Sequence, residues 1–512
     1  MSRQTPTPMS EMGGQKAMPV LACRGERMRK YVNLLRRGAV ASSANKFDIC
    51  SNPDGVINLG TSENRLVFDL LRERLDGYNV KWEDYMFTYN DFQGIPELRE
   101  AVAGFLTDCA KSLTPIDPKK IVVMNGGGIC MEALSFAICD PGDAVMVASP
   151  YYGGIENDNT MRPEAKVIRV HFYSKLEPGQ TEPFEITISK FESVYQEQTQ
   201  KGVKIRAVCF MNPNNPLGDV YPKQFVLDML QFCHRHSLHL IMNEVYMNTI
   251  FKEGADFQSF LSFKPEEIPD PQRVHFVWAV SKDLSMSGMR FGVIHTQNES
   301  IISCINSFTY FQTLSAYIQK VMACLLSDRD WLNNVYFPTN HKRLREAHKV
   351  TTDTLDEMGV PYLNRPSGLF VYANFQKFLP SLTKEDEMAL FYRFIDDGVY
   401  IAPSLAFFAD ERGWFRIIFS RPFNEVKTAM GRLKKSCNAL LEENKKLSSA
   451  TAVSDESKGA GPSDSAQGMS LEGLLSQLKT EISSSDWLEK NTADKWKTEN
   501  PELYKEYKAN MK

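Results

Sequence analysis

The stretch HFVWAVSKDLSMSGMRFG, residues 275–292, constrains the fold more than any other part of the sequence. Its apolar run is typical of a strand that is buried on both faces of a sheet. The run ends at Lys282, and a turn of small residues leads on to Arg290. A lysine at the end of a buried strand can have a lowered pKa and form a Schiff base, and an arginine can bind a phosphate with its planar fork. Taken alone, the pair is equally compatible with a loop lysine and a surface arginine.

Similar apolar runs recur between about residues 48 and 443, and helical patterns separate them. Each run ends in polar, glycine or proline residues; the runs are KIVVMNG (120–126), AVMVASP (144–150), IRAVCFMNP (205–213) and LHLIMNE (238–244). Continuous apolar strands that alternate with helices predict an α/β protein whose mostly parallel sheet is covered on both faces. Ligands of such sheets bind beyond the carboxyl ends of the strands. The residues after these runs are therefore the candidate site.

Two of these strand ends carry further signals. In MNPNNPLGDVY (211–221), Asn215 lies between two prolines, which stiffen the backbone and suit a directional hydrogen bond to a ligand. Asn-Pro-rich stretches are also common turns. In VVMNGGGICMEAL (122–134), three glycines run into a helix, whose N-terminus attracts an anion. The spacing matches neither GxGxxG nor GxxxxGK[ST], so it predicts a single phosphate rather than a dinucleotide or nucleoside triphosphate.

Composition excludes several other classes of protein. The 512 residues include 59 basic and 63 acidic side chains, so the net charge of -4 predicts no general affinity for nucleic acid. The sequence has no run of about 18 consecutive apolar residues, so no membrane-spanning helix is expected. The 10 cysteines form no CxxC pair, which favours a reducing, cytoplasmic environment and no metal site. The basic stretch 23–40 favours a surface helix over the alternative, a mitochondrial transit peptide.

Taken together and in this order, the motifs resemble the fold type I pyridoxal-phosphate enzymes of the aminotransferase class I/II family. Within that family the sequence most resembles 1-aminocyclopropane-1-carboxylate synthases and their animal synthase-like relatives. Further motifs carry the resemblance; they are INLGTSEN (57–64), GIPELREAVAGFL (94–106), DPGDAVMVASPYYGG (140–154) and GWFRIIFS (413–420). The resemblance implies a large domain with a mostly parallel seven-stranded sheet and a small α+β domain. It also implies a pyridoxal 5'-phosphate cofactor, an amino acid substrate and a homodimer.

The resemblance also implies a role for each matching residue. Lys282 would bind the cofactor covalently and shuttle protons, with Tyr246 as the second catalytic residue. The implied cofactor-binding residues are Gly127, Gly128, Ser281 and Arg290, Tyr152 stacked on the ring, Asn215 and Tyr246 at the phenolic oxygen, Asn243 at the ring nitrogen, and Tyr89 lent by the neighbouring subunit. For the substrate, Arg416 would bind the α-carboxylate and Glu63 would contact another part of the molecule.

Four positions depart from the family pattern. Asn243 stands where the family has an aspartate that keeps the pyridine nitrogen protonated, and a neutral amide cannot supply that charge. Ile129 and Ala279 stand where the family often has hydroxyl side chains that bind the phosphate. Phe92 replaces a tyrosine that is linked to ring closure in the plant-type synthases. Phe92 argues against cyclopropane formation, whereas Asn243 would weaken the electron sink, and Ile129 and Ala279 would weaken phosphate binding.

Two functional hypotheses follow. The first is a pyridoxal-phosphate enzyme that acts as an aminotransferase or amino-acid lyase, and the second is a catalytically weakened protein of the same fold that serves as a binding or scaffold protein. An unrelated nucleotide-binding α/β protein is a third, weaker alternative. The expected organisation is a flexible segment (1–47), an N-terminal arm with part of the small domain (48–95), a large cofactor-binding domain (96–335), a small domain (336–446), a linker (447–468) and a helical tail (469–512) whose apolar stripe could bind a partner protein.

Overall fold

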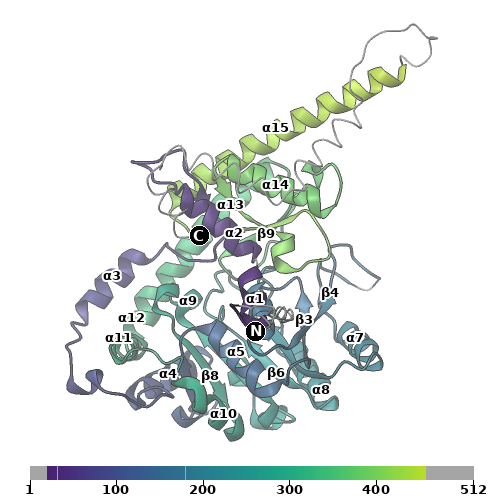
Figure 1. The fold of residues 1–512 in the computed structure, drawn as a ribbon. Coiled ribbons are helices and arrows are strands. Elements are labelled where there is room, and N and C mark those ends of the chain that lie inside the picture. Colours follow the sequence, from purple (N-terminus) through teal and green to yellow (C-terminus); the bar gives the residue numbers. More distant parts are fainter. Residues whose placement is uncertain (1–19, 32, 179, 457–512) are drawn as a thin grey trace, which may run out of the picture. The chain divides into compact units, whose positions relative to one another are not determined.

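The computed structural model describes residues 20–31, 33–178 and 180–456 (Figure 1). The chain divides into two compact units, Met1–Glu442 and Glu443–Lys512. In the second unit, the described residues are the end of helix α15 (Phe423–Glu456). The expected linker therefore begins with helical residues, and the expected tail 469–512 lies outside the described residues.

A seven-stranded sheet forms the centre of the first unit, in the order β2-β8-β7-β6-β5-β3-β4. Strand β8 pairs antiparallel with both of its neighbours, and the other pairs are parallel. The strands are β2 (Ile121–Met124), β3 (Ala144–Ser149), β4 (Lys166–His171), β5 (Ile205–Met211), β6 (His239–Asn243), β7 (Val274–Ala279) and β8 (Gly292–Thr296). The expected mostly parallel sheet is confirmed.

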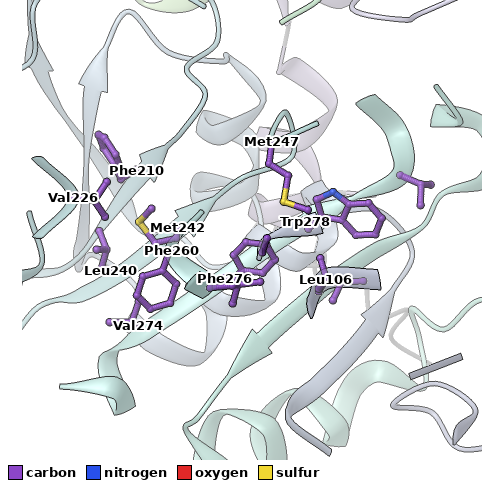
Figure 2. Close-up of a cluster of buried hydrophobic side chains, with 14 of the residues drawn as sticks. Leu106, Phe210, Val226, Leu240, Met242, Met247, Phe260, Val274, Phe276 and Trp278 are labelled. Atoms are coloured by element: carbon purple, nitrogen blue, oxygen red, sulfur yellow. The ribbon is translucent and has the colours of Figure 1, made fainter. Parts of the chain in front are cut away.

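Helices cover both faces of this sheet because its strands carry apolar side chains on both sides. Along β6, Leu240 and Met242 pack on one face while Ile241 packs on the other. On the first face lie α4 (Pro96–Cys109), α7 (Ile188–Gln200), α8 (Lys223–Arg235) and α11 (Ala316–Ser327), and Figure 2 shows part of this core around Phe276 and Trp278. On the second face lie α5 (Gly127–Ile138), α6 (Gly154–Thr160) and α10 (Glu299–Thr309). This alternation follows from the period of two in a strand.

A second apolar core brings together segments from both ends of the unit. Its sheets have the orders β11-β12-β9 and β1-β10. The elements are β1 (Ile57–Asn58), β9 (Phe370–Asn374), β10 (Val399–Tyr400), β11 (Ala402–Pro403), β12 (Trp414–Ile418), α13 (Phe337–Glu357) and α14 (Lys384–Asp396), with the first part of α15. The remaining helices are α1 (Cys23–Lys30), α2 (Leu34–Ala44), α3 (Phe68–Gly77), α9 (Val280–Asp283) and α12 (Arg329–Trp331).

The N-terminal helices lie in the stretch 1–47 and contact both parts of the unit. Arg24 and Arg27 of α1 form ion pairs with Glu164, at 2.9 and 3.2 Å. Helix α2 approaches β10, where the Tyr400 hydroxyl donates to the backbone oxygen of Leu35 at 3.0 Å. The described part of the basic stretch 23–40 therefore belongs mostly to the two helices α1 and α2.

Two buried histidines make the stability of the fold depend on pH. At the amino ends of β6 and β7, His239 Nδ1 lies 2.9 Å from His275 Nε2, and His275 Nδ1 lies 2.8 Å from the Thr296 hydroxyl. Burial lowers the pKa of His239 to about 4, with a further contribution from Arg273, and burial lowers the pKa of His275 to about 3. Both imidazoles are therefore neutral in the folded protein at neutral pH.

We expect acid to destabilise the protein through this pair. An unfolded histidine titrates near about 6.5, so the unfolded chain binds more protons than the folded one between that pH and the lowered pKa values. The stability is complete above about pH 6.5 and is lost as the pH falls through this window, by about 2 kcal/mol per histidine between about pH 7.5 and about pH 5. Urea unfolding at both pH values measures the loss. His275→Gln should reduce the difference, whereas His234→Gln, at an exposed position, should not; an unchanged pH dependence in His275→Gln would refute the assignment.

Candidate functional site

The carboxyl edge of the large sheet gathers residues from five strand ends. Gly126 follows β2, Tyr152 follows β3, Asn215 follows β5, Asn243 ends β6 and Lys282 follows β7. Strands β2, β3, β5, β6 and β7 all run in one direction, so their carboxyl ends meet at the same edge. This is the edge at which open α/β sheets bind ligands.

A chain of hydrogen bonds joins the lysine region to the arginine of β12. Arg416 Nη1 donates to Asn215 Oδ1 at 2.7 Å, and Asn215 Nδ2 donates to the Tyr246 hydroxyl at 3.3 Å. That hydroxyl lies 3.0 Å from Ser62 Oγ, and Lys282 Nζ donates to the backbone oxygen of Ser62 at 2.5 Å. The structure therefore brings together four of the residues expected in the site, from four distant segments of the chain.

Lys282 has an environment that weakens its affinity for a proton. Its side chain is partly accessible at the site, but its amine is surrounded by protein. Burial lowers the pKa of Lys282 to about 8, and the positive charges of Arg416 and Arg290 contribute, while Glu63 opposes them. A neutral amine is the reactive form of lysine, so a substantial fraction is available as nucleophile or base near neutral pH.

Arg416 is held rigidly and yet keeps a free donor. It is 1% exposed, and its Nη2 donates to the backbone oxygen of Gly60 at 2.7 Å. The guanidinium lies over the rings of Phe370 and Phe407, at 5.3 and 4.7 Å from the ring centroids. Its buried Nε has no hydrogen-bond partner. A fixed arginine with an unsatisfied donor is suited to bind a carboxylate.

A glycine-lined cup lies at the start of α5. Gly126 has a φ of 101° and provides no capping side chain, so the first N–H groups of the helix remain available to an anion. A Cβ on Gly126 would collide with the Arg290 guanidinium, and a Cβ on Gly292 would lie 2.5 Å from the Gly126 carbonyl carbon. The glycines thus let Arg290 approach the helix N-terminus. Arg290 adopts a left-handed backbone, with φ 50° and ψ 49°, as residues at functional sites often do.

The residues around this cup are accessible on the side where a ring would stack. Tyr152 is 40% exposed, and its ring lies against Gly154. Gly128 and Arg290 are exposed as well, whereas Asn215, Asn243 and Tyr246 below them are buried. Ser281 lies in the first turn of α9, next to Lys282. An open, polar rim above a buried polar floor is the form of a ligand site.

Asn243 has only weak partners in this floor. Its Nδ2 donates to the sulfur of Met131 at 3.8 Å, and its Oδ1 accepts from the Val245 N–H at 3.3 Å. The next residue, Glu244, cannot replace the missing acid, because its Oε1 accepts from the Phe260 N–H in the core on the opposite face of the sheet. Burial raises the pKa of Glu244 to about 8. The Asn243 position therefore carries an amide and no carboxylate.

The cup also lacks the hydroxyl groups that the family often has there. The Cβ of Ala279 lies 3.4 Å from the position that a Cβ on Gly127 would occupy, so a methyl group faces the cup. Ile129 follows in the same turn of α5. Asp158, which the sequence analysis missed, lies with its Oδ1 3.3 Å from the corresponding Cβ position of Gly128. Burial and, to a smaller extent, the charge of Glu132 raise the pKa of Asp158 well above its usual range.

Asp283 is a second residue that sequence reasoning missed. It accepts hydrogen bonds from Trp278 Nε1 at 2.8 Å and from the backbone and side chain of Asn248, both at 3.0 Å. These bonds attach the short helix α9, which contains Lys282, to the turn that follows β6. Burial raises the pKa of Asp283 to about 7. Its place directly after the lysine, as an acid amid apolar residues, was the available signal.

Two expected site residues lie apart from this cluster or at its margin. Tyr89 is 89% exposed, and its ring packs against Phe92, 6.2 Å away. Glu63 lies next to Ser62, and its Oε1 accepts a long hydrogen bond of 3.4 Å from Ser287. Glu63 is therefore beside the lysine, while Tyr89 does not reach it within one chain.

Among the described residues, no group of three or more histidine, cysteine or acidic side chains is arranged to hold a metal ion. All 10 cysteines are free. A separate surface cavity of about 550 Å³, lined by residues of the segment 173–178 and by Glu411, shares no residue with the Lys282 cluster. Within the part of the chain that the structure describes, no helix is long and apolar enough to cross a membrane.

The residues present fit pyridoxal phosphate in three respects and depart from it in one. The amine of Lys282, the cup formed by α5 and Arg290, and the buried pair Asn215 and Tyr246 match the aldehyde, phosphate and phenolic oxygen of the cofactor. The amide of Asn243 does not match the ring nitrogen in its protonated form.

The fold is that of the fold type I, pyridoxal-phosphate-dependent aminotransferases. The chain belongs to the family described as aminotransferase class I and II, whose model matches residues 54–433. Among solved structures, the aspartate aminotransferase of Thermus thermophilus with maleate has a TM-score of 0.65 at 20% identity, covering 82% of this chain and all of that one.

Curated relatives place the chain more narrowly. The 1-aminocyclopropane-1-carboxylate synthase-like protein 1 of Mus musculus is 39% identical over 415 residues, which cover 81% of this chain and 82% of that protein. A human relative, named "Probable inactive 1-aminocyclopropane-1-carboxylate synthase-like protein 2", is 38% identical over 80% of this chain and 71% of its own length. The chain is thus related to the synthase-like proteins, and both the expected family and the expected fold are confirmed.

Proposed function

We propose that this protein binds pyridoxal phosphate through Lys282 and acts on an α-amino acid as an aminotransferase or amino-acid lyase. The observation that carries the proposal is the hydrogen-bonded chain from Arg416 through Asn215 and Tyr246 to the segment that holds Lys282. A fixed arginine with an unsatisfied donor and a lysine of lowered pKa lie at opposite ends of this polar path. A reaction at the Cα of an amino acid needs both a cation that binds the carboxylate and a base that removes the Cα proton.

Each residue contributes a separate step. Arg416 binds and orients the substrate α-carboxylate, which fixes the Cα–H bond relative to Lys282. Lys282 would hold the cofactor through Nζ and, once the substrate amine has taken its place, would accept the Cα proton as the neutral amine and later return it. Tyr246 and Asn215 would donate hydrogen bonds to the phenolic oxygen of the cofactor. The buried residues around them would exclude water. The cofactor, when bound, supplies the electron sink for the resulting carbanion.

The reaction favoured is transamination or elimination rather than closure of a three-membered ring. Phe92 has no hydroxyl, and its ring packs between Tyr89 and Tyr310, with centroids 6.2 and 5.8 Å away. The position that the ring-forming enzymes use thus offers only an apolar surface. Detection of 1-aminocyclopropane-1-carboxylate from S-adenosylmethionine and the purified protein would overturn this preference.

The test of the proposal is spectroscopic and kinetic. Titration of the purified full chain with pyridoxal phosphate should produce the visible band of a lysine-bound cofactor, and a panel of α-amino acids should shift it. Arg416→Ala should leave the band in place and raise KM for the reactive amino acid by about 10²-fold, because a charged hydrogen-bonded contact to the carboxylate is lost. Arg432→Ala is the control. A band that no amino acid shifts would rule out the proposed turnover.

A second candidate function is a catalytically weakened binding or scaffold protein. The observation that favours it is the weakly bonded Asn243 below the ring position, together with the methyl group of Ala279 at the cup. The name of the human relative, which contains "Probable inactive", is consistent with it. This function predicts a folded protein that binds the cofactor weakly and turns over no amino acid.

We further propose that the protein is a homodimer, with Tyr89 reaching the site of the partner. The support is a row of aromatic side chains in mutual contact, in which Tyr89, Tyr310 and Phe311 are 89%, 56% and 72% exposed. Large exposed aromatic patches mark interaction surfaces. We also keep the domain limits given above as a proposal, together with a protein partner for the tail 469–512. A cytoplasmic location is proposed because ten free thiols favour a reducing environment.

A further inference from the structure

Two arginines meet beside the loop that carries Glu63. The Arg65 N–H donates to the backbone oxygen of Ser420 at 2.9 Å, and the Ser420 hydroxyl donates to the backbone oxygen of Glu63, also at 2.9 Å. These bonds tie the loop to the segment that follows β12. Arg421, the residue after Ser420, is thereby placed next to Arg65.

Three side-chain donors of these two arginines are buried and unsatisfied. The side chain of Arg421 is 7% exposed and that of Arg65 is 32% exposed. Nε and Nη1 of Arg421 and Nε of Arg65 are buried, and none of the three has a hydrogen-bond partner. The nearest carboxylates are Glu425, 3.7 Å from Arg421 Nε, and Glu63, 3.8 Å from Arg65 Nη2. Each carboxylate thus forms an ion pair with its arginine, at a distance too long for a hydrogen bond.

Arg432, a half-buried arginine, is satisfied by backbone oxygens. Nη1 of Arg432 donates to the oxygens of Gly55 and Gly398 at 2.7 and 2.9 Å. Such an arginine has a structural role. Arg421 has no comparable acceptors, and it also faces the charge of Arg65. Burial, then the charge of Arg65, lower the pKa of Arg421 to about 10, while Glu425 and Glu63 oppose the shift.

Buried N–H groups without acceptors and neighbouring like charges both disfavour this arrangement in the free protein. An anion would relieve both. The planar fork of a guanidinium matches a carboxylate or a phosphate, which can accept two parallel hydrogen bonds. We propose that Arg65 and Arg421 form an oxyanion-binding site that takes a carboxylate or phosphate group, at the edge of the loop next to Lys282.

The oxyanion has two sources that share this chemistry. One is a second acidic group on the amino acid substrate, since Glu63 is within electrostatic reach of both Lys282 and Arg421. The other is a free anion such as inorganic phosphate. The binding site itself is independent of the proposed function, and only the first source rests on it.

Binding of inorganic phosphate and of succinate to the full chain, measured by calorimetry, tests the site. Because phosphate also fits the cup beside Arg290, the measurement is made in an Arg290→Gln background. Arg421→Gln should then raise the Kd of at least one of the two anions by about tenfold or more, since charged hydrogen bonds are lost. The melting temperature without ligand should stay unchanged or rise, because the buried charge is removed. Arg65→Gln should weaken binding in the same way and serves if Arg421→Gln does not fold.

Arg432→Gln is the matched control, and it should lower the melting temperature without changing the affinity for either anion. The proposal is overturned if Arg421→Gln behaves like this control, or if neither anion binds in a manner that depends on Arg65 or Arg421. The source follows from a comparison of aspartate and glutamate with asparagine and glutamine. A preference for the acidic pair that Arg421→Gln abolishes identifies a substrate group. Equal binding of all four, with phosphate binding unchanged in their presence, identifies a free anion. If the absorbance test of the proposed function fails, the measured anion affinities of the Arg65 and Arg421 variants still decide whether this binding site exists.

Discussion

Lys282→Ala should abolish the visible band that pyridoxal phosphate produces with this protein and should reduce turnover by about 10³-fold or more. The variant removes both the amine that bonds to the cofactor and the general base, and general acid–base catalysis alone contributes about 10²–10⁴-fold. The structure explains why no other group compensates, because the cluster around Ser62, Tyr246 and Asn215 contains no second amine. Absorbance titration and a coupled assay measure the two effects.

The controls for this prediction separate the charge from the nucleophile. Lys282→Arg keeps a positive charge near the backbone oxygen of Ser62 but cannot form the bond, so it should also lose the band. Lys349→Ala, on α13 with 74% of the original side chain exposed, should keep both band and activity. A band that persists unchanged in Lys282→Ala would mean that the cofactor binds elsewhere, and the assignment of the site would fail.

Asn243→Asp should raise the rate of the amino acid half-reaction by roughly 10- to 10³-fold, the largest gain expected from a single substitution. An acid close to the ring nitrogen favours the protonated ring by about 1–3 pKa units, and each unit corresponds to about 1.36 kcal/mol. Asn243 is only 6% exposed, and its present partners are the sulfur of Met131 and the N–H of Val245. A carboxylate there would be unpaired without the cofactor, so the variant should be less stable alone and recover when the cofactor binds.

Single-turnover absorbance changes and thermal unfolding with and without pyridoxal phosphate measure these two effects. Asn243→Leu is the control, because it has a similar volume and provides neither acid nor amide; it should show no gain. If Asn243→Asp is as slow as the natural chain, the amide is not the limiting defect. The missing hydroxyls at Ile129 and Ala279 would then be the next positions to restore.

Much of this arrangement could be predicted from the sequence because it depends on local patterns. Continuous apolar runs that end in polar residues indicated buried parallel strands, and their ends indicated where Lys282, Asn215 and the Gly126 turn would lie. An arginine can bind a phosphate and a lysine can form a Schiff base, and the residue types together with the glycine turn and the order of the motifs led to the expectation of both. Asn243 also stood out in the sequence, as an amide before Glu244.

The remaining features depend on contacts between distant segments, which no local pattern encodes. The link between Arg416 and Lys282 requires that residues 60–62, 215, 246 and 416 meet, and Asp158 reaches Gly128 only because α6 packs against α5. The unsatisfied pair of Arg65 and Arg421 arises from one backbone hydrogen bond between residues 355 positions apart. The sequence by itself determined the α/β class, because this follows from residue type and period, and its ordered motifs indicated the family and, through the resemblance, the expected reactive groups. Only the tertiary structure decided the neighbours of each group, and burial and neighbouring charge set the pKa of Lys282 and leave Arg421 without an acceptor.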